Sequence, residues 1–396
     1  MQMKIHTGMS TKPTAQQAID DICAQLQPEP PGQPDFVALH FSLGWEPAEV
    51  QAAAQAAFGT GALHGGSSCQ GVMTDKGLAM DDGHGMGAFA IWDKEGAYGS
   101  AMADLTSNPR AAARRATEAA LRHADREGEA PELVWLTTAP GAEEAVLDGI
   151  KDVLGREVMI VGGSSADNDV SGKWAQFTNE GAAANSVVVS VLFPSSPVSC
   201  AYQSGYAPTQ THGKVTRVEG RRLHEINGKP AAAVYSAWTD SAVPEAGAED
   251  VSILAASTFF PLGRHSETLA DVPFHLLAHP AVAHPDGSLS LFADVAPDET
   301  LWLMNGSADS LVARAGRVAA SSRDGLDGAG IGGALVIYCG GCMLAVQDRM
   351  DEVAQGVSQA LGGAPFLGVF TFGEQGAPLG SETRHGNLMI SCSSFG

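Results

Sequence analysis

Basic residues are scarce in this sequence, where 23 Lys and Arg stand against 45 Asp and Glu and give a formal net charge of −22. An acidic protein of this kind repels a phosphate backbone, and its most basic stretch, residues 110–123, is typical of a solvated helix face. Long apolar runs are also lacking, since SVVVSVLF (186–193) is the longest and is far too short to span a bilayer. We therefore expect neither a nucleic-acid partner nor membrane insertion.

Cysteine is sparse as well, with 6 residues in 396, which excludes a disulfide framework. Residues 1–22 lack the apolar segment of a secretory signal, so we expect reduced thiols and a cytoplasmic protein. His275 and His279 lack the Glu of a zinc-protease motif, and no spacing supports a catalytic triad. The sequence predicts no metal, no cofactor and no catalytic residue.

What the sequence does contain is a repeated strand–helix–strand pattern in which apolar runs end in glycine. FVALHF (36–41) and LVWLTT (133–138) are typical of buried strands, and a helical pattern follows each of them. Both units end in Gly-Gly-Ser-Ser, and in both 29 residues separate the first strand residue from the first Gly of that turn. A third unit runs from ALVIYC (334–339) to FLGVFTFGE (366–374) and ends in Gly-Glu instead.

Two strands joined by one helix of this length suit parallel pairing, with the helix packed on one face of the sheet. The runs at 89–92, 186–193 and 387–391 have no intervening helix, and we expect them to add antiparallel strands. The sequence thus predicts an α/β or α+β fold of mixed β-sheets with helices packed in layers. A length of 396 residues favours two domains.

The two Gly-Gly-Ser-Ser turns are candidate ligand loops, because Gly permits close approach and Ser offers hydroxyl and N–H groups to a carboxylate or phosphate. The alternative is a tight turn that simply requires Gly. Neither turn is a P-loop or a nucleophile elbow, since no Gly-Lys-Ser/Thr follows and Cys69 and Ala166 stand where the elbow needs Gly. Asp167 is a candidate for binding a ligand amine or belongs to a solvated turn. The candidate turn residues are Gly65, Gly66, Ser67, Ser68, Gly162, Gly163, Ser164 and Ser165.

The segment VIYCGGCMLAVQD (336–348) carries Cys339 and Cys342 with two residues between them. Such a pair can be a redox couple, half of a zinc site or a strand-to-helix turn. A thioredoxin-like domain needs more structure than the 54 residues after Cys342 provide, and the other cysteines form no second zinc-binding pair. The turn is favoured, although a helix N-terminus that lowers a thiol pKa keeps a reactive cysteine open.

Several segments, in their order along the chain, resemble the FIST family (F-box and intracellular signal transduction). GGSSCQGVMTDKG, VMIVGGSSADND and RLHEINGKPAAAVY are similar to its N-terminal domain, and ALVIYCGGC, FLGVFTFGEQGAPLG and HGNLMI to its C-terminal domain. The resemblance covers roughly residues 30 to 392 and implies a first domain over 30–230 and a second over 231–396. Residues 1–29 are expected to form an N-terminal segment with one helix. It also implies a cytoplasmic sensory module that binds a small, amino-acid-like molecule and acts on a signalling protein encoded separately.

The second domain of the family usually carries a Cys, an Arg shortly after it, a Gly-Glu pair and an Asn. Here Cys339, Glu374 and Asn387 match, whereas Cys342 stands where the Arg is expected. We expect these residues, Gly340 and the Gly-Ser turns to converge on one pocket, where Glu374 pairs with a ligand ammonium and the turns hold its carboxylate. Two other functions stay open: a thiol-based redox switch or enzyme, and an adaptor that binds proteins without a ligand.

Overall fold

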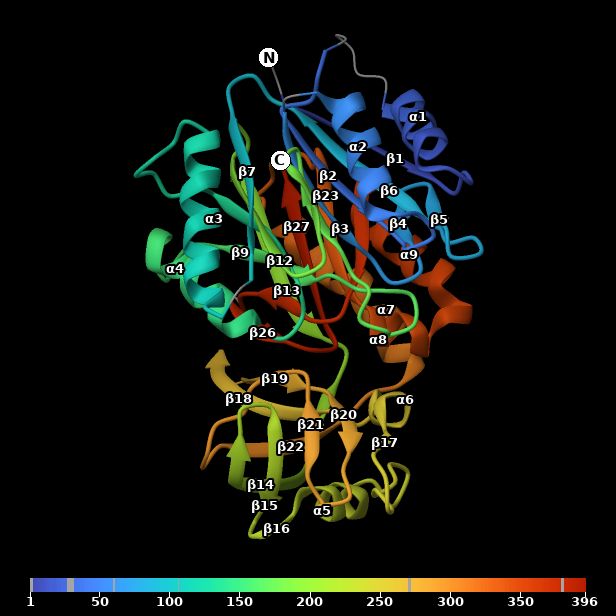
Figure 1. The fold of residues 1–396 in the computed structure, drawn as a ribbon, viewed down its shortest axis with the longest axis vertical. Helices are drawn as coiled ribbons and strands as arrows, with labels where there is room; N and C mark the ends of the chain where they lie inside the picture. The colour runs from blue at the N-terminus through green and yellow to red at the C-terminus, as the bar shows by residue number, and fades with distance from the viewer. Residues whose placement is uncertain (1–2, 27–31, 60, 106, 270–271, 379–380) are drawn as a thin grey trace.

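The computed structural model describes residues 3–26, 32–59, 61–105, 107–269, 272–378 and 381–396. The chain forms an upper body of three sheets with helices around them and a smaller lower body (Figure 1). The upper body contains the elements before residue 205 and after residue 306, and the lower body contains those between. The lower body is therefore an insertion into the chain of the upper body.

The first repeated unit consists of β1 (Lys4–Ser10), α1 (Ala15–Leu26), β2 (Phe36–Phe41), α2 (Pro47–Phe58), β3 (Ala62–Ser67) and β6 (Met86–Trp92). Its sheet runs β1-β6-β2-β3, with β2 and β3 parallel and β6 antiparallel to both β1 and β2. FVALHF forms β2 because a continuous apolar run suits a parallel pair that is covered on both faces, and all its residues are buried. Helix α2 has Pro in its first turn and ends at Gly59, whose φ is 67°.

The second unit consists of β7 (Ala97–Asp104), α3 (Pro109–His123), β8 (Leu133–Thr138), α4 (Glu143–Leu154), β9 (Ile160–Ser164) and β12 (Ser186–Phe193). Its sheet runs β7-β12-β8-β9, and α4 joins the parallel strands β8 and β9. SVVVSVLF forms β12, which is antiparallel to both of its neighbours. Helix α3 begins after Asn108, whose side chain accepts the N–H of Ala111, and lies beside α4 (Figure 1).

The third unit consists of β13 (Val198–Ser204), α7 (Ala308–Asp324), β23 (Gly333–Cys339), α8 (Gly340–Ala345), the 3₁₀ helix η1 (Gln347–Arg349), α9 (Met350–Ala360), β24 (Phe366–Thr371) and β27 (Met389–Phe395). Its sheet runs β13-β27-β23-β24, with β23 and β24 parallel and β27 antiparallel to both of its neighbours. The Cys-x-x-Cys segment is thus a strand-to-helix turn. The predicted α/β architecture of mixed sheets and repeated strand–helix–strand units is confirmed.

Each unit also gives a two-stranded hairpin to a neighbouring sheet. The hairpins are β4 (Val72–Thr74) with β5 (Gly77–Ala79), β10 (Gln176–Thr178) with β11 (Gly181–Ala183), and β25 (Glu374–Gly376) with β26 (Arg384–Gly386). The hairpin of the first unit pairs with β24 of the third, that of the second with β3 of the first, and that of the third with β9 of the second. The three sheets therefore exchange hairpins in a closed cycle.

Backbone hydrogen bonds close this cycle at the carboxyl ends of the parallel strands. They run from the N–H of Ala166 to the carbonyl of Ser67 (3.1 Å), from Phe372 to Ser164 (3.0 Å) and from Cys69 to Phe370 (3.0 Å). The loops that follow the strands of all three units consequently lie next to one another. This is the arrangement that brings strand-end residues from distant parts of the chain into one region.

The lower body consists of β14 (Ala207–Glu219), β15 (Arg222–Ile226), β16 (Lys229–Pro230), α5 (Ala231–Trp238), β17 (Val251–Ser252), α6 (Leu254–Ser257), β18 (Leu262–Leu269), β19 (Val272–Ala278), β20 (Pro280–Ala283), β21 (Leu289–Leu291) and β22 (Thr300–Asn305). Its strands run β17-β20-β21-β15-β14-β22-β18-β19, with β16 beside β15. It has a core of its own, in which Ile226, Tyr235 and Leu301 are buried together. The domain boundary predicted between residues 230 and 231 lies within this body, between β16 and α5.

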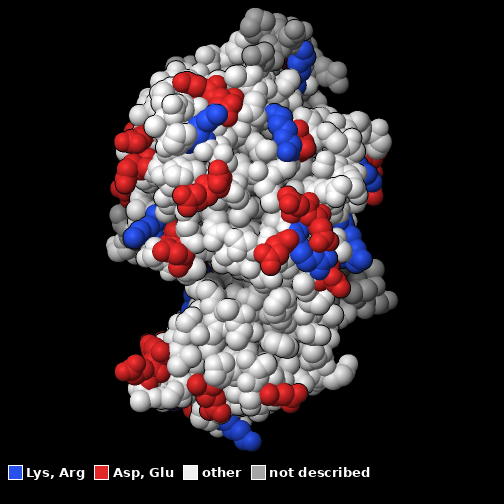
Figure 2. Space-filling model, turned by 90° about the vertical axis from the view of Figure 1, so that its right-hand side faces the viewer, with Lys and Arg blue, Asp and Glu red and all other residues white. Residues whose placement is uncertain are grey.

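The surface carries mainly acidic charge. On the face in Figure 2, acidic side chains are spread over both bodies, basic side chains are interspersed among them, and the molecule narrows where the two bodies meet. Within the described part of the chain, no helix is both long enough and apolar enough to cross a membrane.

Candidate functional site

A cavity of about 430 Å³ lies between the two bodies. The loops after β8, β9 and β23 bound it from the upper body, and the β14–β15 turn, α6 and residues 279–292 bound it from the lower body. Cavities of this size commonly hold small organic molecules. The polar side chains that line it are Glu143, Cys339 and Asn387 from the upper body and Arg221 and His279 from the lower body, with Ser171 at the loop after β9.

The rim of the cavity is apolar. Among the described residues, the large hydrophobic side chains that are exposed are Val170 (42%) and Leu344 (36%), and both line this cavity. Val170 has a φ of 59°, which a β-branched residue rarely adopts, so its loop is held in a strained shape. Trp174, Phe292 and Phe372 add aromatic surface. Exposed apolar groups beside a cavity mark a place where a ligand gains stability by burying them.

Cys339 lines the cavity and is the N-cap residue of α8. The backbone N–H groups of Gly341 and Cys342, at the start of the helix, act to lower its pKa. Burial raises the pKa of Cys339 well above its usual value, and the thiol of Cys342 raises it further, so the group is a protonated thiol near neutral pH. The sequence left open a pKa lowered by the helix N-terminus; in the structure burial outweighs that effect, because the side chain is only 5% exposed.

Glu374 lies behind Cys339, fully buried, and is not among the described residues that line the cavity. One carboxyl oxygen of Glu374 accepts a hydrogen bond from the hydroxyl of Thr371 at 2.9 Å, and the other accepts one from the N–H of Met389 at 3.0 Å. The thiol of Cys339 is also a hydrogen-bond neighbour of this carboxyl group. Burial raises the pKa of Glu374 well above its usual value, and Cys339 is the next cause. The side chain is therefore a buried acid beneath the cavity, placed where a ligand ammonium does not reach it directly.

His279 and Asn387 join the two bodies at the cavity. The main-chain N–H of His279 donates to Asn387 Oδ1 at 3.1 Å, and Asn387 Nδ2 donates to the carbonyl of Phe292 at 3.5 Å. Burial lowers the pKa of His279 to about 4, so its ring is neutral. Its Nε2 lies 3.1 Å from the carbonyl of Leu254 and donates to it. Nδ1 then carries no proton and can accept a hydrogen bond from a ligand.

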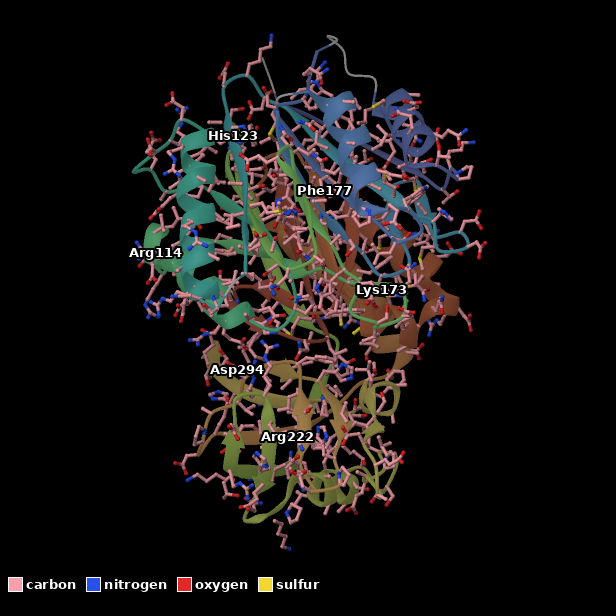
Figure 3. All side chains as sticks on the ribbon, viewed as in Figure 1. Arg114, His123, Lys173, Phe177, Arg222 and Asp294 are labelled. Atoms are coloured by element: carbon pink, nitrogen blue, oxygen red, sulfur yellow. The ribbon has the colours of Figure 1, made fainter. Side chains whose placement is uncertain are left out.

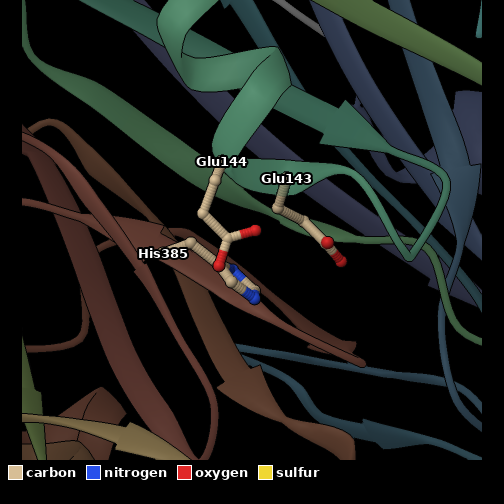
Figure 4. Close-up of side chains that lie close together, drawn as sticks. All are labelled: Glu143, Glu144 and His385. Atoms are coloured by element: carbon tan, nitrogen blue, oxygen red, sulfur yellow. The ribbon is translucent and has the colours of Figure 1, made fainter. Parts of the chain in front are cut away.

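Arg221 connects the bodies by ion pairs. Its Nη2 lies 2.7 Å from Glu143 Oε2 and 2.6 Å from Glu144 Oε2, and its Nε lies 3.1 Å from Asp294 Oδ1. Figure 3 places Asp294 where the two bodies meet, and Figure 4 shows both glutamates, from the start of α4, beside the ring of His385. Burial alone would raise the pKa of Glu144, but the charges of His385 and Arg221 hold it at about 2. The same charges hold the pKa of Glu143 below its usual value.

Glu143, Glu144 and His385 also place possible ligand atoms within 4.8 Å of one another, as a metal ion requires. Arg221, however, already bonds to both carboxylates, and Glu143 accepts two further hydrogen bonds, from the Ser164 hydroxyl at 2.7 Å and from a backbone N–H at 3.0 Å. The carboxylate oxygens are thus already used by the protein. The group is an ion-pair network rather than an open metal site.

The first Gly-Gly-Ser-Ser turn, residues 65–68, is buried and does not belong to the described lining of the cavity. A Cβ on Gly65 would collide with the ring of Phe177, and one on Gly66 would lie 2.5 Å from Thr137 Cγ2. Both Ser hydroxyls are hydrogen-bonded to backbone groups. The glycines of this turn are therefore required by the close packing of neighbouring units.

The second turn, residues 162–165, is buried in the same way. A Cβ on Gly162 would collide with a carbonyl of β8, and one on Gly163 would collide with Thr371. The hydroxyl of Ser164 donates to Glu143 at 2.7 Å, and that of Ser165 donates to a backbone carbonyl at 3.2 Å. This turn therefore supports a cavity residue from behind, through Ser164.

Asp167 shapes the loop that carries Val170 and Trp174 into the cavity wall. Its Oδ2 accepts the backbone N–H groups of Gly172 at 2.5 Å and Lys173 at 2.9 Å, while its Oδ1 is buried and has no hydrogen-bond partner among the described residues. The carboxylate is thus one step removed from the cavity surface.

Cys339 and Asn387 are the residues of the sequence-predicted set that line the cavity, and Gly340 is buried next to Cys339. The glycine-serine turns, Asp167 and Glu374 lie behind this surface. Sequence reasoning missed Arg221, His279 and Glu143, of which two come from the inserted lower body. The pair Glu143-Glu144 is visible in the sequence, at the start of the predicted helix. It did not identify a site, because acidic residues are favoured at a helix N-terminus whether or not a ligand binds there.

Comparisons with known proteins agree with the sequence-based family resemblance. Residues 35–229 match the FIST N domain and residues 231–377 match the FIST C domain. An uncharacterised protein of Methanocaldococcus jannaschii is 35% identical over 88 residues, which span 22% of this chain but only 17% of that protein. A crystal structure of cyanuric acid hydrolase from A. caulinodans aligns over 99% of both chains, with 9% identity and a TM-score of 0.37.

Proposed function

Because the chain belongs to the FIST family, whose domains are sensory domains of signal transduction, we propose that it is a non-enzymatic module that binds a small metabolite and acts through a separate signalling protein. The ligand is an amino acid or a related nitrogen-containing compound. Its place is the cavity between the two bodies.

The proposal rests on the observation that both bodies contribute side chains to the walls of the cavity. Cys339 and Asn387 face the cavity from the upper body, and Arg221, His279 and Phe292 face it from the lower body. A ligand that contacts both bodies favours the arrangement in which they are held together. The two bodies are joined by connections at residues 204–207 and 305–308, and a ligand held by both bodies would stabilise one position of the lower body relative to the upper body. A partner protein would respond to the resulting position of the lower body.

The state of Cys339 supports a binding role over a catalytic one. A cysteine nucleophile needs a lowered pKa, whereas burial raises the pKa of this thiol well above its usual value. The cavity itself favours ligand binding over an adaptor that acts through its outer surface alone.

A thermal-shift screen of the whole chain against a broad metabolite library tests the proposal. A ligand present at about a hundred times its Kd stabilises the folded state by about 2.7 kcal/mol, which raises the melting temperature measurably. The Leu344→Ser variant, altered at the exposed rim, should lose most of the ligand-induced shift. The matched control, Val234→Ser on α5 of the lower body, lies away from the cavity and should keep it. A library without any stabilising compound would count against the proposal, as would equal shifts in both variants.

A further inference from the structure

Arg221 is the one Lys or Arg among the described residues that line the cavity. Its guanidinium is already engaged by the carboxylates of Glu143 and Glu144, at 2.7 and 2.6 Å, and of Asp294, at 3.1 Å. Three carboxylates against one guanidinium leave two negative charges in this ion-pair network, of which Glu143 and Arg221 line the cavity. A protonated His385, which lies beside both glutamates in Figure 4, would still leave one.

Neighbouring charges do not reverse this balance. Arg264 lies on the far side of the same network, where Glu299 and Asp294 are among the acidic groups that act on it. Beneath the loop after β9, the carboxylate of Asp167 is held by the N–H groups of Gly172 and Lys173 and forms no ion pair with any described Lys or Arg. The polar end of the cavity is therefore net negative, in a chain whose net charge is −22.

Among the described residues that line this cavity, a carboxylate would find no unpaired cation, and it would be repelled by the groups around Arg221. An ammonium group meets the opposite conditions. The neutral ring of His279 presents Nδ1 as an acceptor for one N–H, and the faces of Trp174, Phe292 and Phe372 attract a cation while covering an apolar body. The exposed side chains of Val170 and Leu344 extend that apolar surface at the rim.

We propose that the ligand of this cavity is a small organic amine: an ammonium group on an aromatic or branched aliphatic body, without a carboxylate. The proposal rests on the sensory function above and narrows its ligand from amino acids and related nitrogen-containing compounds to amines that carry no acid group. The apolar body lies against the aromatic wall and the rim, and the ammonium group lies at the end where Glu143 and His279 face the cavity.

Matched probes that share one apolar body separate the charge classes. Phenethylamine, phenylalanine and phenylacetate form one set, and isoamylamine, leucine and isovalerate form a second. Titrations of the whole chain, followed by melting temperature and by calorimetry, should show the amine of a set binding at least about tenfold more tightly than its amino acid, with no binding of the acid. Equal or tighter binding of the amino acid or the acid would overturn the proposal.

The outcome also distinguishes this proposal from the broader function. If other metabolites stabilise the chain and no amine does, the amine assignment fails and the sensory function stands. If a broad library produces no shift at all, both fail.

A charge variant tests the physical cause. Glu144→Gln removes one negative charge beside Arg221, and the side chain is partly exposed, so the fold tolerates the change. We expect this variant to weaken binding of the amine about five- to tenfold and to narrow its preference over the amino acid. Asp152→Asn is the matched control, because Asp152 lies on the same helix and pairs with Arg110 away from the cavity. Unchanged amine binding in Glu144→Gln, or the same loss in both variants, would contradict the electrostatic argument.

Discussion

Replacing Glu374 by Gln tests whether the acid beneath the cavity is protonated in the folded protein. Burial raises the pKa of Glu374 well above its usual value of 4.5. A group of this kind takes up a proton on folding. Its contribution to stability is complete below about pH 4.5 and is lost as the pH rises through the folded pKa. Gln has nearly the same shape and does not titrate, so the variant should not show this loss.

The expected magnitude follows from one proton. Between about pH 4.5 and the folded pKa of Glu374, the free energy of unfolding of the wild type should fall by about 1.4 kcal/mol for each pH unit relative to Glu374→Gln. Urea-induced unfolding followed by tryptophan fluorescence, in a series from about pH 5 to about pH 8, measures this difference.

Glu143→Gln is a control of opposite sign. Although burial opposes it, the charges of His385 and Arg221 hold the pKa of Glu143 below its usual value. Its contribution is therefore present above about pH 4.5 and is lost as the pH falls through the folded pKa. In a series extended below about pH 4.5, this variant should be destabilised most at neutral pH and least in acid. If the difference between the wild type and Glu374→Gln did not change with pH, the reasoning about the buried acid would be refuted.

Three further changes test the packing and the cavity. Gly66→Ala should cost about 1–3 kcal/mol of stability in urea unfolding, because the new Cβ would lie 2.5 Å from a methyl group of β8. Gly356→Ala, whose Cβ meets open space in α9, should stabilise the protein by about 1 kcal/mol. Similar effects of the two variants would contradict the packing argument. Arg221→Met leaves the buried Glu143 without its cation, so the free energy of unfolding should fall by about 3–5 kcal/mol at neutral pH and by less in acid. A loss of stability that does not depend on pH would argue against the ion pair. Cys339 should resist iodoacetamide near neutral pH in the folded chain, because it is buried and burial raises its pKa. It should react after unfolding, and mass spectrometry measures both rates of labelling. Rapid labelling of the folded chain would instead support the reactive-cysteine hypothesis.

The strands of the three units were predictable because each is a continuous apolar run, and β2 and β8 match FVALHF and LVWLTT residue for residue. The exchanged hairpins were not predictable in the same way. Strands β4 and β10 are three residues long, and their partners lie in other units, so neither periodicity nor local turn chemistry identifies them. The inserted lower body was hidden for a similar reason, since pairs such as β14 with β22 and β15 with β21 join strands that are far apart in the sequence.

The candidate site was only partly readable. Cys339 and Asn387 followed from the family resemblance, but Arg221 and His279 are isolated residues in the sequence and meet the cavity only through the packing of two bodies. The Gly-Gly-Ser-Ser turns satisfied two explanations at once, a ligand loop and a packing requirement, and only the positions of neighbouring atoms distinguish them. Cys342, which replaces an expected Arg, is fully buried with the Tyr206 hydroxyl 3.6 Å from its sulfur.

The exchanged hairpins also govern when this protein can finish folding on the ribosome. The hairpin of the first unit needs β24 as its partner, and the N–H of Phe370 donates to the hydroxyl of Ser68 across 302 residues of chain. The first unit therefore emerges long before its binding partner is synthesised, and an unpaired strand edge in such an intermediate promotes aggregation. A ribosome that stalls before β24 would release a chain in which two of the three sheets of the upper body lack strands, so nascent chains of this protein should depend on chaperones until the last unit is complete.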